Sequence, residues 1–158
     1  MRYYFTREDF DILLREIESV DDRIKLAAKE MGLSCQQSSE TFHDNFGFEQ
    51  AERDRGMWSN HIRQLMEVKN NAEIIVPGPN QGKVRMGRMV KILDLDTKDE
   101  KTFRVGSYMI LNAEKADGTS TLSYDAPLPK ALLGAGEGDY REVLFGGEKH
   151  RYVILKIE

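Results

Sequence analysis

Apolar residues near the start of the chain recur at alternating spacings of three and four positions. They are Phe10, Leu13, Ile17, Val20, Ile24, Ala27 and Met31. A sustained period of about 3.5 residues is typical of a helix that packs along a coiled-coil seam. The pattern predicts a helix from about Arg7 to Met31. Thr6 and Asp9 resemble a capping box at its start, and Gly32 is a plausible end.

A second and weaker stripe follows the polar segment of residues 33–43. It consists of Phe48, Ala51, Arg55, Trp58, Ile62, Leu65, Lys69 and Ala72. Two helices with a short polar connection between them are typical of an antiparallel hairpin. We therefore expect a helical coiled-coil finger over residues 1–76, with its tip at the polar segment. Asp44 or Asn45 is expected to cap the returning helix.

Beyond the linker sequence Pro77-Gly78-Pro79-Asn80, the pattern changes to short segments typical of β-strands. They predict a hairpin of 89–95 with 102–105, a short strand at 122–124, and a closing hairpin of 141–145 with 151–157. A brief helix over 126–133, capped by Asp125 and closed by Gly134, is expected between them. The whole chain is thus predicted to be α+β. The finger spans 1–76, the linker 77–82, and a small antiparallel-sheet domain with one short helix 83–158.

Composition and charge narrow the possible partners. The chain has 158 residues and a net charge of −4, and the excess of acidic residues lies in the finger. Strong autonomous binding to duplex DNA needs a concentrated basic face, so we do not expect it. The single cysteine, Cys35, cannot form an internal disulfide, and no apolar run is long enough to span a membrane. We expect a cytoplasmic monomer.

Three segments resemble the bacterial Gre transcript-cleavage factors. Residues 123–134 read SYDAPLPKALLG and resemble the Gre signature S-x-x-S-P-[IL]-[AG]-[RK]-A-L-[IL]-G. Residues 82–87 are similar to the motif G-x-V-x-[FL]-G that opens the family's C-terminal domain. In the finger, Asn45, Ala51 and Gly56 are in register with the family's tip-and-return motif. The resemblance covers essentially the full chain and implies an FKBP-like C-terminal domain.

The resemblance also implies a partner and a mechanism. Gre factors bind bacterial RNA polymerase, with the C-terminal domain at the rim of the secondary channel and the finger directed at the active site. Tip carboxylates there help to hold a second Mg²⁺ and a water, so that backtracked RNA is hydrolysed. The chain would share this Mg²⁺ with the polymerase and would need no cofactor of its own. It would meet the nascent RNA 3′ end only indirectly and would not itself be an enzyme.

Several residues are candidates for these roles. Asp125, Pro127 and Lys130, in and beside the short helix, are candidates for binding the polymerase, whereas the leucines at 128, 132 and 133 are expected in the core. Arg53 and Arg55 are candidates for contact with the RNA backbone. Arg55 also falls on the seam by its spacing, so it can instead extend from the edge of the core.

The tip departs from the family pattern. The two tip carboxylates of Gre factors fall on positions 41 and 44, where this chain has Thr41 and Asp44. Asp44 keeps the negative charge and is the candidate Mg²⁺ ligand, but Thr41 is neutral. If the tip is helical, Glu40 lies one turn from Asp44 on the same face and can act as the second carboxylate. Otherwise Glu40 is a solvated loop charge.

Three hypotheses for the function therefore stay open. In the first, the chain binds the secondary channel and modulates backtracked complexes, including stimulation of RNA cleavage. In the second, it is a Gre-like occupant of the channel that inhibits or modulates without cleavage, as the altered tip suggests. In the third, it is a coiled-coil adaptor unrelated to transcription, and it does not co-purify with RNA polymerase.

Overall fold

The computed structural model describes residues 1–37, 46–109 and 119–158. They form two compact units. One consists of Asp11–Ala72, and the other joins Met1–Phe10 to Glu73–Glu158. Each unit is considered by itself, and we call the second one the C-terminal unit. The division of the sequence into 1–76, 77–82 and 83–158 stays a prediction.

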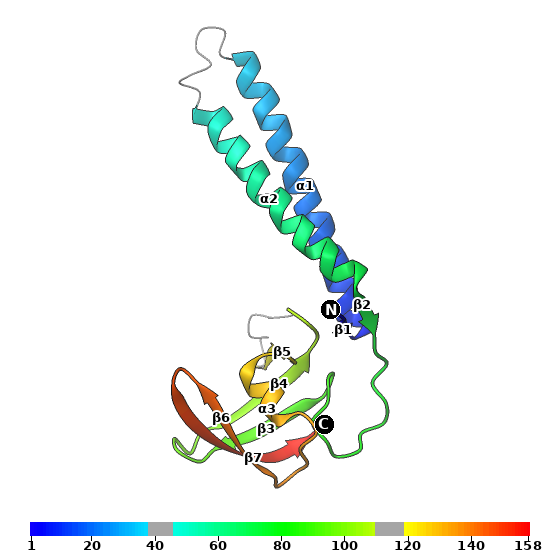
Figure 1. Ribbon diagram of the computed structural model, residues 1–158, viewed down its shortest axis with the longest axis vertical. Helices are drawn as coiled ribbons and strands as arrows, with labels where there is room; N and C mark the ends of the chain where they lie inside the picture. The colour runs from blue at the N-terminus through cyan, green and yellow to red at the C-terminus, as the bar shows by residue number, and fades with distance from the viewer. Residues whose placement is uncertain (38–45, 110–118) are drawn as a thin grey trace. The chain divides into compact units, whose positions relative to one another are not determined.

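The first unit is the predicted antiparallel helical hairpin (Figure 1), built from α1 (Arg7–Gln37) and α2 (Phe46–Asn70). Every residue of the predicted α1 stripe is buried or half-buried. Two side-chain contacts give the pairing of the helices. Glu16 Oε1 lies 3.7 Å from His61 Nε2, and the guanidinium carbon of Arg23 lies 4.5 Å from the centre of the Trp58 ring. Arg23, the later residue in α1, therefore contacts Trp58, the earlier residue in α2, which is the order expected of an antiparallel pair.

Two details of the hairpin differ from the prediction. The helix α1 continues through Gly32 and ends at Gln37, because a lone glycine costs only about 1 kcal/mol relative to alanine and no proline follows it. In α2, Val68 is buried while Arg55 is exposed. A helix with about 3.6 residues per turn drifts relative to a 3.5-residue pattern, so the buried set moves by one position along its length.

The C-terminal unit contains a five-stranded sheet in the order β5-β4-β3-β7-β6. Its strands are β3 (Met89–Asp94), β4 (Glu100–Gly106), β5 (Ser120–Ser123), β6 (Tyr140–Phe145) and β7 (Glu148–Ile157). Both predicted hairpins, β3–β4 and β6–β7, are antiparallel. The predicted α+β class is confirmed, but the sheet is mixed, because β5 pairs with β4 in parallel. Parallel neighbours need a connection of about a dozen residues or more, and residues 107–119 are long enough to supply it.

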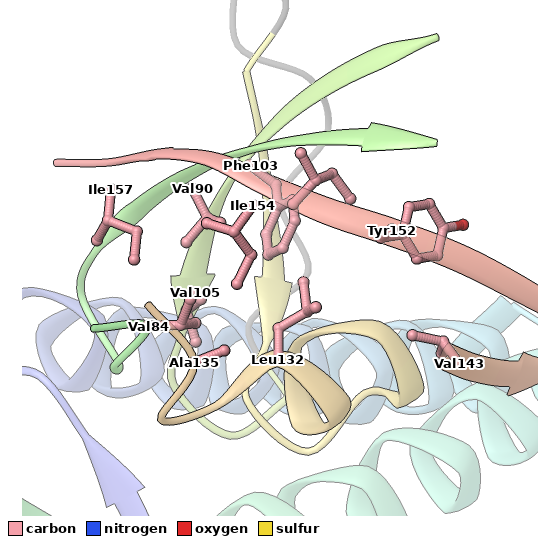
Figure 2. Close-up of a cluster of buried hydrophobic side chains, with 11 residues drawn as sticks. Val84, Val90, Phe103, Val105, Leu132, Ala135, Val143, Tyr152, Ile154 and Ile157 are labelled. Atoms are coloured by element: carbon pink, nitrogen blue, oxygen red, sulfur yellow. The ribbon is translucent and has the colours of Figure 1, made fainter. Parts of the chain in front are cut away.

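The core of this unit lies between the sheet and α3 (Pro127–Leu132). Figure 2 shows Leu132 of α3 directed at the side chains of Phe103 and Ile154, which come from the sheet. All three are almost fully buried. Burying a side chain of this size stabilises a fold by about 1.5–3 kcal/mol, so these contacts hold α3 against the sheet.

Two short strands and the start of α1 complete the C-terminal unit. They are β1 (Tyr3–Phe5) and β2 (Ala72–Ile74), which pair as a separate two-stranded sheet. Neither strand is among the elements that the sequence predicted. Thr6 Oγ1 accepts the Asp9 backbone N–H at 3.2 Å, which confirms one half of the capping box. The Asp9 carboxylate makes its own contacts elsewhere.

Candidate functional site

The predicted tip residues Glu40, Thr41 and Asp44 lie outside the described residues. The predicted role of Asp44 as a Mg²⁺ ligand, and of Glu40 beside it, therefore stays a prediction from the sequence. Within the described ranges, no group of three or more His, Cys, Asp or Glu side chains is arranged to hold a metal ion. The structure does show which helix ends flank the tip in sequence, because α1 ends at Gln37 and α2 begins at Phe46.

Arg53 and Arg55 both lie on the surface of α2. The guanidinium of Arg53 lies 3.6 Å from the Glu49 carboxylate, and its Nε donates to the Glu49 carbonyl at 3.4 Å. Arg55 is exposed, which fits both a contact with a partner and a side chain that extends outward from the edge of the seam. Residues two apart on a helix point roughly 200° apart around its axis. The two arginines therefore do not form one joint basic patch, although each is accessible to a partner.

Trp58 is half-buried in the hairpin, as the seam spacing predicted. Its ring contacts the Arg23 guanidinium of α1 and lies edge-on to His61, with ring centres 6.1 Å apart. A cation over an indole ring is attracted by the negative charge of the ring face. This pair was not foreseen, since helical spacing alone does not show which residues face each other across two helices.

The candidate polymerase-binding residues Asp125, Pro127 and Lys130 are all exposed, at and beside α3. Asp125 was predicted to cap the helix, but it does not. The N-cap is Ala126, which makes no side-chain hydrogen bond, and Pro127 follows it. Because proline has no backbone N–H, one of the groups that a cap would satisfy is missing. The Asp125 carboxylate instead accepts a hydrogen bond from the Ser123 hydroxyl.

The leucines of α3 divide between the core and the surface. Leu132 is buried and Leu128 half-buried, as predicted, but Leu133 is 39% exposed. Pro127, Lys130 and Leu133 follow each other at intervals of three, so they lie on neighbouring parts of the helix surface. We call these three residues with Asp125 the α3 surface. It offers both charges and an apolar side chain, the combination that a protein-binding surface needs.

The buried carboxylate of Asp9 is the most enclosed charged group of the C-terminal unit. It accepts hydrogen bonds from Arg104 Nη2 at 2.7 Å, Ser107 N–H at 3.0 Å and Ser107 Oγ at 2.6 Å. Burial by itself raises the pKa of Asp9. The hydrogen bonds from Arg104 and Ser107 outweigh it and hold the pKa below its usual value. The sequence held one clue to this network. Asp is shorter than the Glu or Gln of a full capping box, so its carboxylate is left for other partners.

Comparison with known proteins agrees with this architecture. The family model described as "Transcription elongation factor, GreA/GreB, C-term" matches residues 79–158. Transcription elongation factor GreA of Thermotoga neapolitana is 31% identical over 161 residues, covering 96% of this chain and 94% of the relative. GreA of Ruegeria pomeroyi is 31% identical over 115 residues, covering 73% of this chain and 71% of the relative.

Two solved structures are similar as well. One is the GreA factor homolog Gfh1 of Thermus thermophilus, which is 21% identical with a TM-score of 0.46 and covers 100% of this chain and 99% of its own. The other is a prokaryotic GreA/GreB elongation factor from Nitrosomonas europaea, which is 16% identical with a TM-score of 0.39 and covers 99% and 98%.

The family match over residues 79–158 and the GreA relative that covers 96% of the chain define a class of protein, the transcription elongation factors. The chain belongs to the GreA/GreB family of transcription elongation factors. The resemblance drawn from residues 82–87 and 123–134 is thereby confirmed, and the chain is an elongation factor, not an enzyme in its own right. No helix among the described residues is long and apolar enough to cross a membrane.

Proposed function

We propose that this elongation factor binds bacterial RNA polymerase through its secondary channel and modulates backtracked elongation complexes. The observation that carries the proposal is family membership along nearly the whole chain, with a GreA relative matching 96% of it. The hairpin supports it. A helix of 31 residues is about 46 Å long, so a two-helix finger of this kind reaches deep into a narrow channel.

The tip residues decide what the finger does there. Mg²⁺ prefers oxygen ligands and is commonly held by one or two carboxylates together with phosphate oxygens and water. Asp44 and Glu40 carry carboxylates that fit this preference, whereas the hydroxyl of Thr41 has no charge to offer a cation. When bound, the shared Mg²⁺ would stabilise the charge that develops during RNA hydrolysis by the polymerase. Asp44 is the principal tip residue in this proposal, with Glu40 as the second carboxylate.

The non-cleaving alternative rests on Thr41. A tip with one carboxylate in place of two supplies less negative charge to a metal that the polymerase only partly holds. In that case the factor occupies the channel and changes elongation without RNA cleavage. Both versions use the same docking residues, namely Asp125, Pro127 and Lys130 on the α3 surface. In both, Arg53 and Arg55 are the candidates for contact with the RNA backbone, since both are exposed on α2.

The experiment uses backtracked elongation complexes with 3′-labelled RNA, Mg²⁺ and the purified factor. We expect the wild type to release short 3′ fragments and the Asp44→Asn variant to lose most of this activity. Glu40→Gln shows whether the second carboxylate contributes. Glu30→Gln on the exposed surface of α1 is the matched control, because it removes one carboxylate from the hairpin outside the tip.

The same complexes separate the alternatives. If the wild type releases no fragments but competes with an authentic GreA protein for the polymerase, the non-cleaving version is correct. If it neither cleaves nor competes, and does not co-purify with RNA polymerase, the proposal is wrong and the adaptor hypothesis takes its place.

A further inference from the structure

Residues 75–82 form a strap that is fastened along the C-terminal unit. The Arg88 guanidinium donates a hydrogen bond to the Gly78 carbonyl. Asn80 donates from its side-chain amide to the Ile157 carbonyl at 3.1 Å, and its amide oxygen accepts the Gly82 N–H at 2.9 Å. The sequence predicted a linker over residues 77–82. The hydrogen bonds give these residues a defined path beside the end of β7.

The strap is also held by a close contact with Gly87. This glycine has a φ of 87°, in the region that side chains rarely adopt. A Cβ built on it would lie 3.1 Å from Cγ of Pro77. The absence of a side chain at position 87 therefore lets the strap lie directly on the backbone. A segment seated this closely presents its outer side chains in fixed positions.

A groove of about 230 Å³ lies along the strap. Its apolar part includes Val76, which is 85% exposed, and Met86, which is half-buried. Its polar part includes Lys83, Arg85 and Arg88. The volume is below that of a typical small-molecule site, so the groove suits single side chains of a peptide better than a whole ligand.

The charge of the groove is of one sign. None of the ten described residues that line it is acidic. Arg88 is engaged by the Gly78 carbonyl, but Lys83 and Arg85 are exposed, and neither has an ion-pair partner among the described residues. This contrasts with a chain whose net charge is −4. Two unpaired cations beside exposed apolar side chains complement a segment that carries both carboxylates and an apolar residue.

We propose that this strap groove binds an acidic peptide segment of RNA polymerase. An apolar side chain of that segment packs on Val76 and Met86, and its carboxylates lie against Lys83 and Arg85. This inference rests on the proposed function, because it assigns a second contact with the same partner. The groove lies apart in sequence from the α3 surface and does not include the tip. A protein segment fits better than RNA, since the described residues that line the groove include no aromatic ring on which a base could stack.

The test measures the affinity of the full-length factor for bacterial core RNA polymerase at two salt concentrations. The variant Lys83→Gln/Arg85→Gln removes both free cations of the groove. The control Lys101→Gln/Lys149→Gln makes the same change in net charge at two exposed positions of the sheet. Thermal unfolding of all three proteins establishes that the fold is intact. We expect about fivefold weaker binding for the groove variant, a smaller salt dependence, and no change for the control.

A second variant tests the apolar half of the groove. Val76→Ser at this exposed position is expected to weaken binding about threefold, equally at both salt concentrations, because it removes apolar contact and no charge. Loss of affinity in both variants with an unchanged control supports the proposal.

Four results would overturn it. Equal affinity of the groove variant and the wild type disproves the inference and leaves the proposed function intact, whereas failure of the wild type itself to bind the polymerase removes the proposed function. Competition for the groove by a single-stranded RNA oligonucleotide assigns the site to nucleic acid. A dimer in light scattering that Lys83→Gln/Arg85→Gln abolishes assigns it to the acidic surface of a second copy.

Discussion

The Asp9 carboxylate lies 2.7 Å from the Arg104 guanidinium, although 95 positions of sequence separate the two residues. Asp9 is 1% exposed and also accepts two hydrogen bonds from Ser107. The first turn of α1 is therefore tied to β4 by a buried and fully hydrogen-bonded charge. Removing one partner of such a pair leaves the other without compensation, which is more costly than never forming the pair.

The variant Asp9→Asn keeps the size of the side chain and removes its charge. We expect it to lower the free energy of unfolding by about 3 kcal/mol, because Arg104 is left partly buried without its anion. Urea denaturation followed by circular dichroism measures the loss. Asp21→Asn is the control, since its ion pair with Lys25 lies on the surface, where such pairs contribute little to stability. Equal losses in the two variants would contradict a special role for Asp9.

The pH dependence of stability follows from the lowered pKa of Asp9. A carboxyl whose pKa is lower in the folded chain binds protons more readily after unfolding. Its stabilisation is therefore complete above the unfolded pKa of about 4 and is lost as the pH falls through the folded value. We expect the unfolding free energy of the wild type to fall more steeply below about pH 4 than that of Asp9→Asn. Parallel curves for the two proteins would refute this expectation.

Gly87→Ala should destabilise the C-terminal unit for two reasons that can be separated. The positive φ strains any side chain, and the new methyl group would press on Pro77. Gly138→Ala carries the first cost alone, because its φ is 82° and nothing lies within 4 Å of the added carbon. We expect a loss of about 1 kcal/mol at position 138 and about 1 kcal/mol more at position 87. Adding Pro77→Ala should restore part of the difference.

The contact between Arg23 and Trp58 predicts a measurable coupling across the hairpin. A double-mutant cycle of Arg23→Ala and Trp58→Ala should give an interaction energy of about 0.5–1 kcal/mol, as expected for an exposed cation above an indole ring. The comparison is the same cycle with Arg63→Ala in place of Arg23→Ala, because Arg63 is an exposed arginine of α2. A coupling near zero would show that the two side chains do not meet in solution.

Thr41→Glu tests the hypothesis that the tip lacks one of the two carboxylates of the family pattern. On the proposed function, this change restores the charge that the family pattern has at position 41. It should raise the rate of 3′-fragment release from backtracked complexes by about tenfold or more, which corresponds to about 1.4 kcal/mol of the activation barrier. Thr41→Gln adds a side chain of similar size without charge and should leave the rate unchanged.

Much of the fold could be predicted because it depends on local periodicity. The α1 stripe marks the buried face of the helix at every position, and the alternating segments mark β3, β4, β6 and β7. The parallel pairing of β5 could not be predicted, since strand order is set by contacts between distant residues. The end of α1 was missed because a lone glycine costs a helix only about 1 kcal/mol and does not have to end it.

The candidate site was predictable in its exposed residues and not in its buried ones. Asp125, Pro127 and Lys130 are on the surface, as a signature with polar and proline positions suggested. Leu133 was expected in the core because leucine is usually buried, but it follows the last turn of α3 and faces solvent. The network around Asp9 joins residues far apart in sequence, so no local pattern announces it.

The position of β7 inside the sheet has a consequence for how the chain folds during synthesis. This strand lies between β3 and β6, and Met89 and Glu158 exchange two backbone hydrogen bonds at its end. The hairpin of α1 and α2 depends on contacts close in sequence and can form as soon as both helices have been made. Until β7 is added, nothing joins β6 to β3 in the sheet, and non-local pairings of this kind form slowly. The helical hairpin should therefore be folded on the ribosome while the sheet is still incomplete.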